Sequence, residues 1–318
     1  EQIVAPLLEV DGGLPPALRA KALQIVGFML SQYAQSLATS ARAVAFFQRS
    51  LALCRELGDV QGTIKALDAL AMMARYPGNE ARTRALLEES LALQRELGRP
   101  RAETLNQLGM LLTEQGDYAG AVASFTHGLA IAREAGQPVG EIVLSMNMAE
   151  ALRRRGEAAR ARRLFAAVLE QGRLRELSEI IAEASLRLGQ LAAADDALEI
   201  ASGLYATSLA GYRELGIQSM LAVVLRSQAQ LALLAGDAAA APDLLREALR
   251  LSSATFSVEA AAHCLSATAA LAALRGDNER AATLLGVADG LGARLGLQPE
   301  PINKRVRALV APALARLG

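Results

Sequence analysis

The chain has 318 residues, with 33 basic and 33 acidic side chains and therefore no formal net charge at pH 7. A balanced charge gives no general attraction to nucleic acid or to an anionic membrane surface. Hydrophobic residues make up 52% of the chain although aromatic residues make up only 3%, because Ala and Leu are in excess. Both are strong helix formers, so the composition predicts an all-α protein.

The chain opens on EQIVAPLLEV, which looks like the last turns of a helix whose beginning is missing. The sequence shows no signal-peptide architecture, and no apolar run reaches the roughly 18 residues of a membrane-spanning helix. Cys54 and Cys264 lie far apart and form no CxxC motif, which favours buried free thiols in a reducing compartment. We therefore expect a fragment of a larger cytoplasmic protein with no membrane partner.

Two columns of residues recur with a period of about 40 residues. The first holds large apolar side chains at Phe47, Leu87, Phe125, Phe165, Tyr205, Leu245 and Leu285. The second precedes it by 16 positions and holds small residues at Ala71, Gly109, Ala149, Gly189, Ala229 and Ala269. In the first repeat Gly27 takes this place only if SQYAQSLATS contains about four extra residues.

Each repeat is expected to be a pair of helices, because glycines mark both an inner turn and a turn to the next pair. Gly58, Gly98, Gly136 and Gly216 stand where a helix end favours left-handed backbone. The small column predicts helices that cross closely, and the large column is expected to fill the wedge between one pair and the next. The predicted fold is one all-α, right-handed superhelical solenoid of seven hairpins over 14–59, 60–99, 100–138, 139–178, 179–218, 219–258 and 259–299, closed by a capping helix over 302–318.

These columns resemble the tetratricopeptide repeat (TPR), with leucine–glycine in QLG, an alanine twelve residues later, an aromatic residue and then a small one. Leu86 to Gly98 (LLEESLALQRELG) and Glu279 to Pro301 (ERAATLLGVADGLGARLGLQPEP) resemble parts of bacterial MalT-like and AfsR-like signal-transduction ATPases and LuxR-type regulators. The resemblance implies a C-terminal sensor domain, with ATP-binding and DNA-binding parts upstream. This chain contains no GxxxxGK[ST] motif and no helix-turn-helix signature.

In arrays of this class the first helix of each pair lines the concave face. Counting from the small column predicts an inward-facing groove of Lys65, Asp68, Met72, Arg75, Glu103, Asn106, Met110, Met146, Glu150, Arg153, Arg226 and Gln230. Charges, amides and methionines suit an extended peptide or a partner's helix, and Asn106 resembles the groove asparagine of peptide-binding arrays. The alternative is that these residues are ordinary solvated positions of a scaffold.

Arginines outnumber acids between Arg153 and Arg175, notably at Arg154, Arg155, Arg160, Arg162 and Arg163. This stretch is a candidate contact for an acidic partner, such as an upstream ATPase domain of the same protein. The alternative is a helix surface balanced by acids of neighbouring repeats. Interleaved aromatics are missing, so nucleic acid is not favoured as a ligand.

The histidines, His127 and His263, form no recognisable catalytic or metal-binding motif, and nothing in the sequence requires a cofactor. We therefore expect a non-enzymatic array that binds a protein, a peptide or a small inducer. It would be the sensing domain of an ATP-dependent transcriptional regulator or, alternatively, a free-standing adaptor or peptide receptor.

Overall fold

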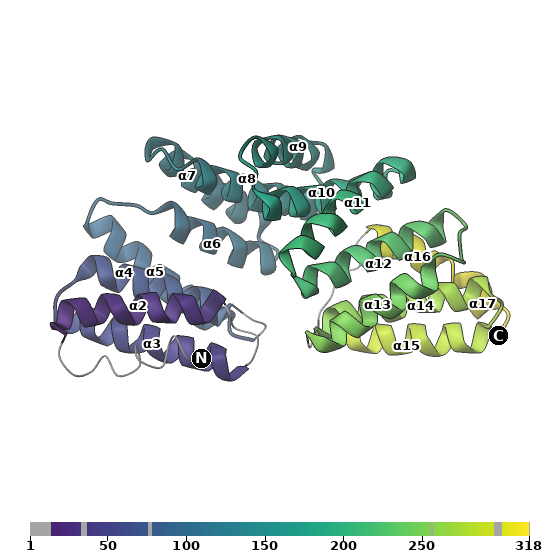
Figure 1. Ribbon diagram of the computed structural model, residues 1–318, viewed down its shortest axis with the longest axis horizontal. Helices are drawn as coiled ribbons and strands as arrows, with labels where there is room; N and C mark the ends of the chain where they lie inside the picture. The colour runs from purple at the N-terminus through teal and green to yellow at the C-terminus, as the bar shows by residue number, and fades with distance from the viewer. Residues whose placement is uncertain (1–13, 33–36, 76–77, 256, 296–300, 318) are drawn as a thin grey trace. The chain divides into compact units, whose positions relative to one another are not determined.

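The computed structural model describes residues 14–32, 37–75, 78–255, 257–295 and 301–317. Over these ranges every regular element is a helix, which confirms the prediction of an all-α repeat array (Figure 1). None of the described helices is long and apolar enough to cross a bilayer. The helix fragment predicted at the start of the chain lies outside the described residues.

The helices form two compact units that divide between Glu157 and Ala158. Unit 1 contains α2 (Pro16–Gln32), α3 (Leu37–Glu56), α4 (Val60–Ala74), α5 (Glu80–Glu96), α6 (Ala102–Glu114), α7 (Tyr118–Glu134) and α8 (Pro138–Arg154). Its hairpins are α2–α3, α4–α5 and α6–α7, and each hairpin packs on the helix that follows it.

Unit 2 begins with α9 (Ala158–Leu174) and continues with three hairpins. These are α10 (Ser178–Ala194) with α11 (Leu198–Leu215), α12 (Gln218–Leu234) with α13 (Ala241–Ala254), and α14 (Val258–Leu274) with α15 (Asn278–Leu295). Two short helices follow, α16 (Pro301–Ala308) and α17 (Ala311–Ala315).

The glycines between hairpins adopt the backbone geometry expected of them. Gly58, Gly98, Gly136 and Gly216 have φ between 60° and 68°, a region that other residues occupy only with strain. Their amide groups bond back to the preceding helix, as in Gly216 N to the Arg213 carbonyl at 3.2 Å. These turns let each helix stop and the next one reverse.

The two sequence columns meet inside the hairpins. A β-carbon added to Gly109 would lie 2.5 Å from Cε1 of Phe125, so the ring occupies the space that a side chain on Gly109 would need. Phe125 was expected to fill the wedge between pairs, and its ring in addition covers its own partner helix. The same side chain also belongs to a cluster with Leu144 of the next repeat, so it links the two.

Gly189 and Gly203 give a matched test of this packing, since both lie inside helices of the hairpin α10–α11. An added β-carbon at Gly189 would lie 2.6 Å from the Tyr205 ring, whereas one at Gly203 would meet nothing within 4 Å. We expect Gly189→Ala to lower the free energy of unfolding by about 1–2 kcal/mol, because overpacking outweighs the gain in helix propensity.

Gly203→Ala should instead raise stability by about 0.5–1 kcal/mol, because only the helix propensity changes. Urea denaturation of both variants beside the parent measures the two effects. Equal effects of the same sign would contradict the close approach of Tyr205 to α10.

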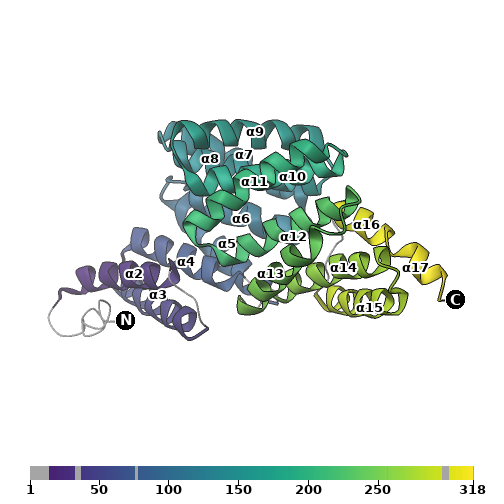
Figure 2. The same cartoon turned by 45° about the vertical axis from the view of Figure 1, so that its right-hand side comes forward.

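The C-terminal segment differs from the single capping helix predicted over 302–318. It forms two helices, and Pro312 lies in the first turn of the second, where its missing amide proton is tolerated. α17 contacts α15 of the last hairpin, as expected of a cap. α16 instead packs against α14, α12 and α10, the first helices of the unit 2 hairpins (Figure 2).

Candidate functional site

The first helices of successive repeats in unit 1, α4, α6 and α8, lie next to one another and present one common surface. We call this surface the unit 1 inner face, and it consists of Lys65, Met72, Arg75, Glu103, Asn106, Met110, Glu114, Asn147, Glu150, Arg153 and Arg154. It contains eight of the predicted groove residues together with Glu114, Asn147 and Arg154, which the groove prediction omits.

Two asparagines join α6 to α8 at the centre of this face. Nδ2 of Asn147 donates to Oδ1 of Asn106 at 2.9 Å, and both residues are half-buried. Nδ2 of Asn106 also lies 3.7 Å from the sulfur of Met110, one helical turn further along α6. The groove prediction included the neighbouring Met146 and omitted Asn147, because helical register alone does not fix how α8 is rotated about its axis.

Arg75 bridges α4 and α6 beside these asparagines. Its Nε lies 3.0 Å from Oε1 of Glu114, and its Nη1 lies 3.1 Å from the sulfur of Met110. Burial raises the pKa of the Glu114 carboxyl, while Arg75 and Arg154 oppose that rise. The predicted Arg75 and Met110 are therefore brought together, and Glu114 provides the balancing charge.

Glu150 on α8 holds two arginines. Its carboxylate accepts from Nε of Arg153 at 2.8 Å and from Nε of Arg154 at 2.7 Å. Only 10% of the Arg153 side chain is exposed, compared with 46% for Arg154. Of the two, Arg154 is the one that a ligand would meet.

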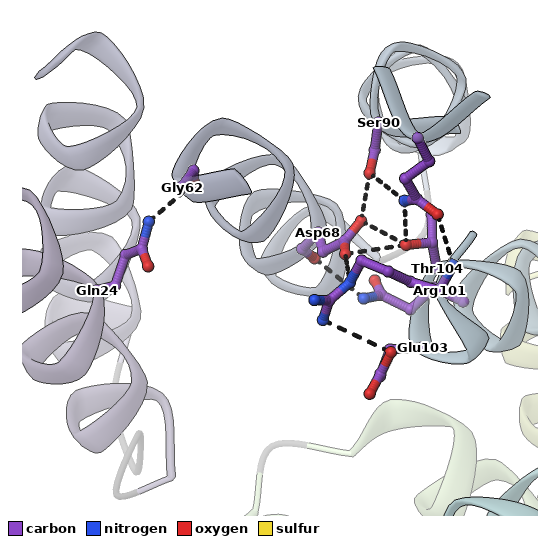
Figure 3. Close-up of polar contacts among 9 residues, drawn as sticks. Gln24, Gly62, Asp68, Ser90, Arg101, Glu103 and Thr104 are labelled. Carbon is purple, nitrogen blue, oxygen red and sulfur yellow. Dashed lines mark hydrogen bonds and ion pairs between the residues drawn. The ribbon is translucent and has the colours of Figure 1, made fainter. Parts of the chain in front are cut away.

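Asp68 is buried at a joint between repeats, where its carboxylate meets Ser90, Thr104 and Arg101 (Figure 3). Its carboxylate accepts from Ser90 Oγ on α5 at 2.7 Å and from Thr104 Oγ1 on α6 at 2.9 Å, and Arg101 Nε lies 3.4 Å away. Gln94 donates to both hydroxyls. Burial raises the pKa of the Asp68 carboxyl, against the effect of these hydroxyls and of Arg101. Asp68 is therefore not accessible to a ligand on the inner face, which corrects the groove prediction for this residue.

The other predicted residues of this group divide by exposure. Lys65, Met72 and Glu103 are exposed on the inner face, and Glu103 lies 3.5 Å from Arg101. Met146 is only 7% exposed and belongs to the core of unit 1. This corrects the prediction for Met146, because the side chain points between helices and not toward the surface.

Arg226 and Gln230 lie on the first-helix surface of unit 2, as their register predicted, but they are covered. Both are buried, and their amide and guanidinium groups contact Asn303 of α16. The sequence prediction of an open groove at these positions is therefore corrected: the chain's own C-terminal segment lies over them.

The arginine-rich stretch is largely balanced by acids. Arg154 pairs with Glu150, Arg155 with Glu157, and Arg162 with Asp195 of α10. Arg160 is also engaged in an interaction, and Arg163 is exposed. The alternative of a surface neutralised by neighbouring acids thus fits the structure better than an uncompensated basic patch.

The histidines lie in different surroundings. His127 is exposed on α7 and lines a shallow hollow of about 470 Å³ with Leu91, Pro100 and Leu105. Nδ1 of His263 lies 3.3 Å from Nδ2 of Asn303. No cluster of three or more metal-ligating side chains occurs in the described part of the chain, where both cysteines are free and buried.

One segment of the chain matches a known repeat family in sequence. Residues 101–135, which span α6 and α7, match the family model of the tetratricopeptide repeat. No curated protein matches the chain in sequence.

Solved structures resemble the whole described fold at low sequence identity. The apo form of the quorum sensor NprR from B. thuringiensis has a TM-score of 0.65 and 13% identity, over 99% of this chain and 88% of that one. NprR in complex with its cognate peptide NprX has a TM-score of 0.58 and 12% identity, over 92% of this chain and 88% of that one.

Two further structures are similar. A Rap protein complexed with competence and sporulation factor has a TM-score of 0.61 and 13% identity, over 95% and 91% of the two chains. A signal-transduction ATPase with a tetratricopeptide repeat sensor, from Pyrococcus horikoshii, has a TM-score of 0.56 and 12% identity over 94% of this chain. This chain spans 50% of that ATPase.

At these identities the likeness establishes the fold. Residues 101–135 are a tetratricopeptide repeat, and the chain has the fold of tetratricopeptide-like arrays.

Proposed function

We propose that this chain is a non-catalytic binding array whose unit 1 inner face holds a peptide or an extended segment of a partner protein. The observation that carries the proposal is the pair of half-buried amides, Asn106 and Asn147, flanked by ion pairs at Arg75 and Glu150. A side-chain amide has both donors and acceptors, so it can match the N–H and C=O groups of a peptide backbone.

The chemistry around the amides favours a peptide over a small inducer. The two amides provide two carbonyl oxygens and two NH₂ groups. The bond between them uses the oxygen of Asn106 and the NH₂ group of Asn147, so the oxygen of Asn147 and the NH₂ group of Asn106 remain to face a peptide. Met72 of α4 and Met110 of α6 add adaptable apolar surface to the same face, which suits irregular side chains. The ion pairs fix the long side chains, so less conformational entropy is lost when a ligand binds.

In the wider protein, we propose that the array senses a ligand for a cytoplasmic, ATP-dependent transcriptional regulator. Its support is the resemblance of Leu86–Gly98 and Glu279–Pro301 to such regulators and the fold shared with the TPR-containing ATPase. The alternative, a free-standing adaptor or peptide receptor, is supported by the fold shared with NprR, whose structure includes its cognate peptide. Both contexts use the same inner face.

The test replaces the two asparagines together. A random peptide library displayed on phage is selected on the immobilised chain, and the strongest peptide is synthesised with a fluorescent label. We expect Asn106→Ala with Asn147→Ala to weaken its binding by roughly tenfold or more, because each hydrogen bond contributes about 0.5–1.5 kcal/mol. Arg153 is left unchanged, since Glu150 holds its guanidinium and only 10% of its side chain is exposed.

His127→Ala is the matched control, because His127 is exposed on α7, the second helix of its hairpin. It should bind the peptide as the parent does, and all variants should melt near the parent temperature. Unchanged binding by the double asparagine variant would place recognition elsewhere. Failure of the library to yield any peptide that competes on this face would also count against the proposal.

A further inference from the structure

The inner surface of unit 2 is occupied by the chain itself. α16 lies against α10, α12 and α14 (Figure 2). Ile302 and Val306 of α16, and Val310 just after it, are each at most 3% exposed. These side chains recur every four residues and belong to one core cluster. A short amphipathic helix therefore occupies the unit 2 surface that corresponds to the open inner face of unit 1.

Beneath α16 lies a polar cluster centred on Asn303. Its Oδ1 accepts from Nε2 of Gln230 at 2.6 Å and from Nη1 of Arg226 at 3.4 Å. Its Nδ2 lies 3.3 Å from Nδ1 of His263. Arg226, Gln230 and Asn303 are all at most 5% exposed, so water has little access to their polar groups.

The cluster has more donors than acceptors. Arg226 brings five N–H groups and a full positive charge, yet its buried Nε has no hydrogen-bond partner. No carboxylate among the described residues forms an ion pair with Arg226, although a buried cation is normally paired. The nearby Cys264 does not supply the anion, because burial raises the pKa of its thiol. The neutral side-chain carbonyls of Gln230 and Asn303 accept from Nη1 of Arg226 at 3.2 and 3.4 Å, and they meet this demand only in part.

A second contact fixes α16 at the end of α10. Nη2 of Arg305 lies 2.6 Å from Oδ1 of Asp196, and its Nη1 donates to the Ala193 carbonyl in the last turn of α10 at 2.6 Å. Asp196 has φ of 64°, in a turn where the corresponding residues of other hairpins, such as Gly116 and Gly236, are glycines. Asp196 thus departs from the repeat pattern, with strained backbone, at the one turn that Arg305 reaches.

We propose that the inner surface of unit 2 is a binding site for an amphipathic helix that carries a carboxylate, and that α16 occupies it as a neutral, displaceable placeholder. The carboxylate of the incoming helix takes the place of the Asn303 amide, where both oxygens can accept from Arg226 and Gln230. Its apolar residues take the places of Ile302 and Val306. Arg305 and Asp196 form the latch that this helix must release.

The test uses the full chain and a labelled peptide of residues 301–318 that carries Asn303→Asp, with the unchanged peptide for comparison. Fluorescence anisotropy should show the Asp peptide binding at least about tenfold more tightly than the Asn peptide. Arg226→Gln in the chain should abolish this preference. Arg305→Ala in the chain should strengthen binding, because the attached α16 then competes less effectively. These opposite signs distinguish displacement from a general loss of structure.

A second variant tests the proposal through the stability of the chain as well as through peptide binding. Asn303→Asp in the full chain should raise the melting temperature and weaken binding of the peptide, because the new carboxylate pairs with Arg226 and secures α16. Lys304→Gln changes the charge by the same amount at the adjacent exposed position and should do neither. A lower melting temperature for Asn303→Asp, or equal binding of both peptides, would overturn the proposal.

Discussion

Phe125→Ala is expected to lower the free energy of unfolding by about 3–5 kcal/mol, the usual cost of deleting a buried aromatic ring. The Phe125 side chain has no exposed surface and packs with Ala121, Leu129 and Leu144. Its ring also covers Gly109, so the variant leaves a cavity within the hairpin α6–α7 and weakens the contact with α8.

The loss should be partly local, because each repeat of such an array is stabilised mainly by its neighbours. Amide hydrogen exchange should therefore accelerate in α6, α7 and α8 more than in α2. Urea denaturation measures the total effect. Phe28→Ala is the control: Phe28 is 53% exposed on α2, so its removal should change stability by less than about 1 kcal/mol. Similar losses for the two variants would mean that Phe125 is not the packing centre of its hairpin.

The helical fold could be predicted because it follows from short-range spacing. A small residue and a large apolar one, 16 positions apart, can meet only if two helices fold back on each other, and Gly109 and Phe125 do so. Positions at helix ends likewise predicted the positive φ of four glycines, namely Gly58, Gly98, Gly136 and Gly216. Neither inference needs knowledge of distant contacts.

The candidate site was harder to predict, because burial depends on which helices surround a residue. Asp68 and Arg75 share one predicted face of α4, yet Asp68 is enclosed by Ser90 and Thr104 whereas Arg75 reaches α6. Helical register gives the direction of a side chain, but not the depth at which the neighbouring repeat covers it. The pairing of Arg154 with Glu150, in contrast, follows from a spacing of four residues on one helix, although the prediction considered only acids of neighbouring repeats.

The position of α16 could not be inferred from its pattern alone. Apolar residues at Ile302, Val306 and Val310 suit a helix on the last hairpin as well as one across the inner surface of unit 2. One signal was present: Asp196 stands where the repeat pattern otherwise has glycine. This strained residue pairs with the distant Arg305, so the departure from the repeat pattern marks the turn that α16 contacts.

Deletion of residues 301–318 is the other change with a large expected effect. It uncovers the surface that Ile302, Val306 and Val310 bury, and these side chains share one core cluster with Leu285 and Leu231. Burial of three such residues contributes on the order of 5 kcal/mol, since each aliphatic side chain contributes roughly 1.5–3 kcal/mol. The truncated chain should therefore melt at a lower temperature.

The exposed apolar surface should also make the truncated chain associate, because contiguous apolar patches of this kind favour contact between molecules. Multi-angle light scattering should detect dimers or larger species at concentrations where the parent is monodisperse and of lower mass. Deletion of residues 316–318 alone is the control: of the described residues it removes only Arg316 and Leu317, which are exposed beyond α17, and it leaves α16 in place, so mass and melting temperature should match the parent. If the longer deletion behaved in the same way as this control, α16 would contribute nothing to the stability of unit 2. The contacts of Asn303 and Arg305 would then be too weak to hold the segment on α10, α12 and α14.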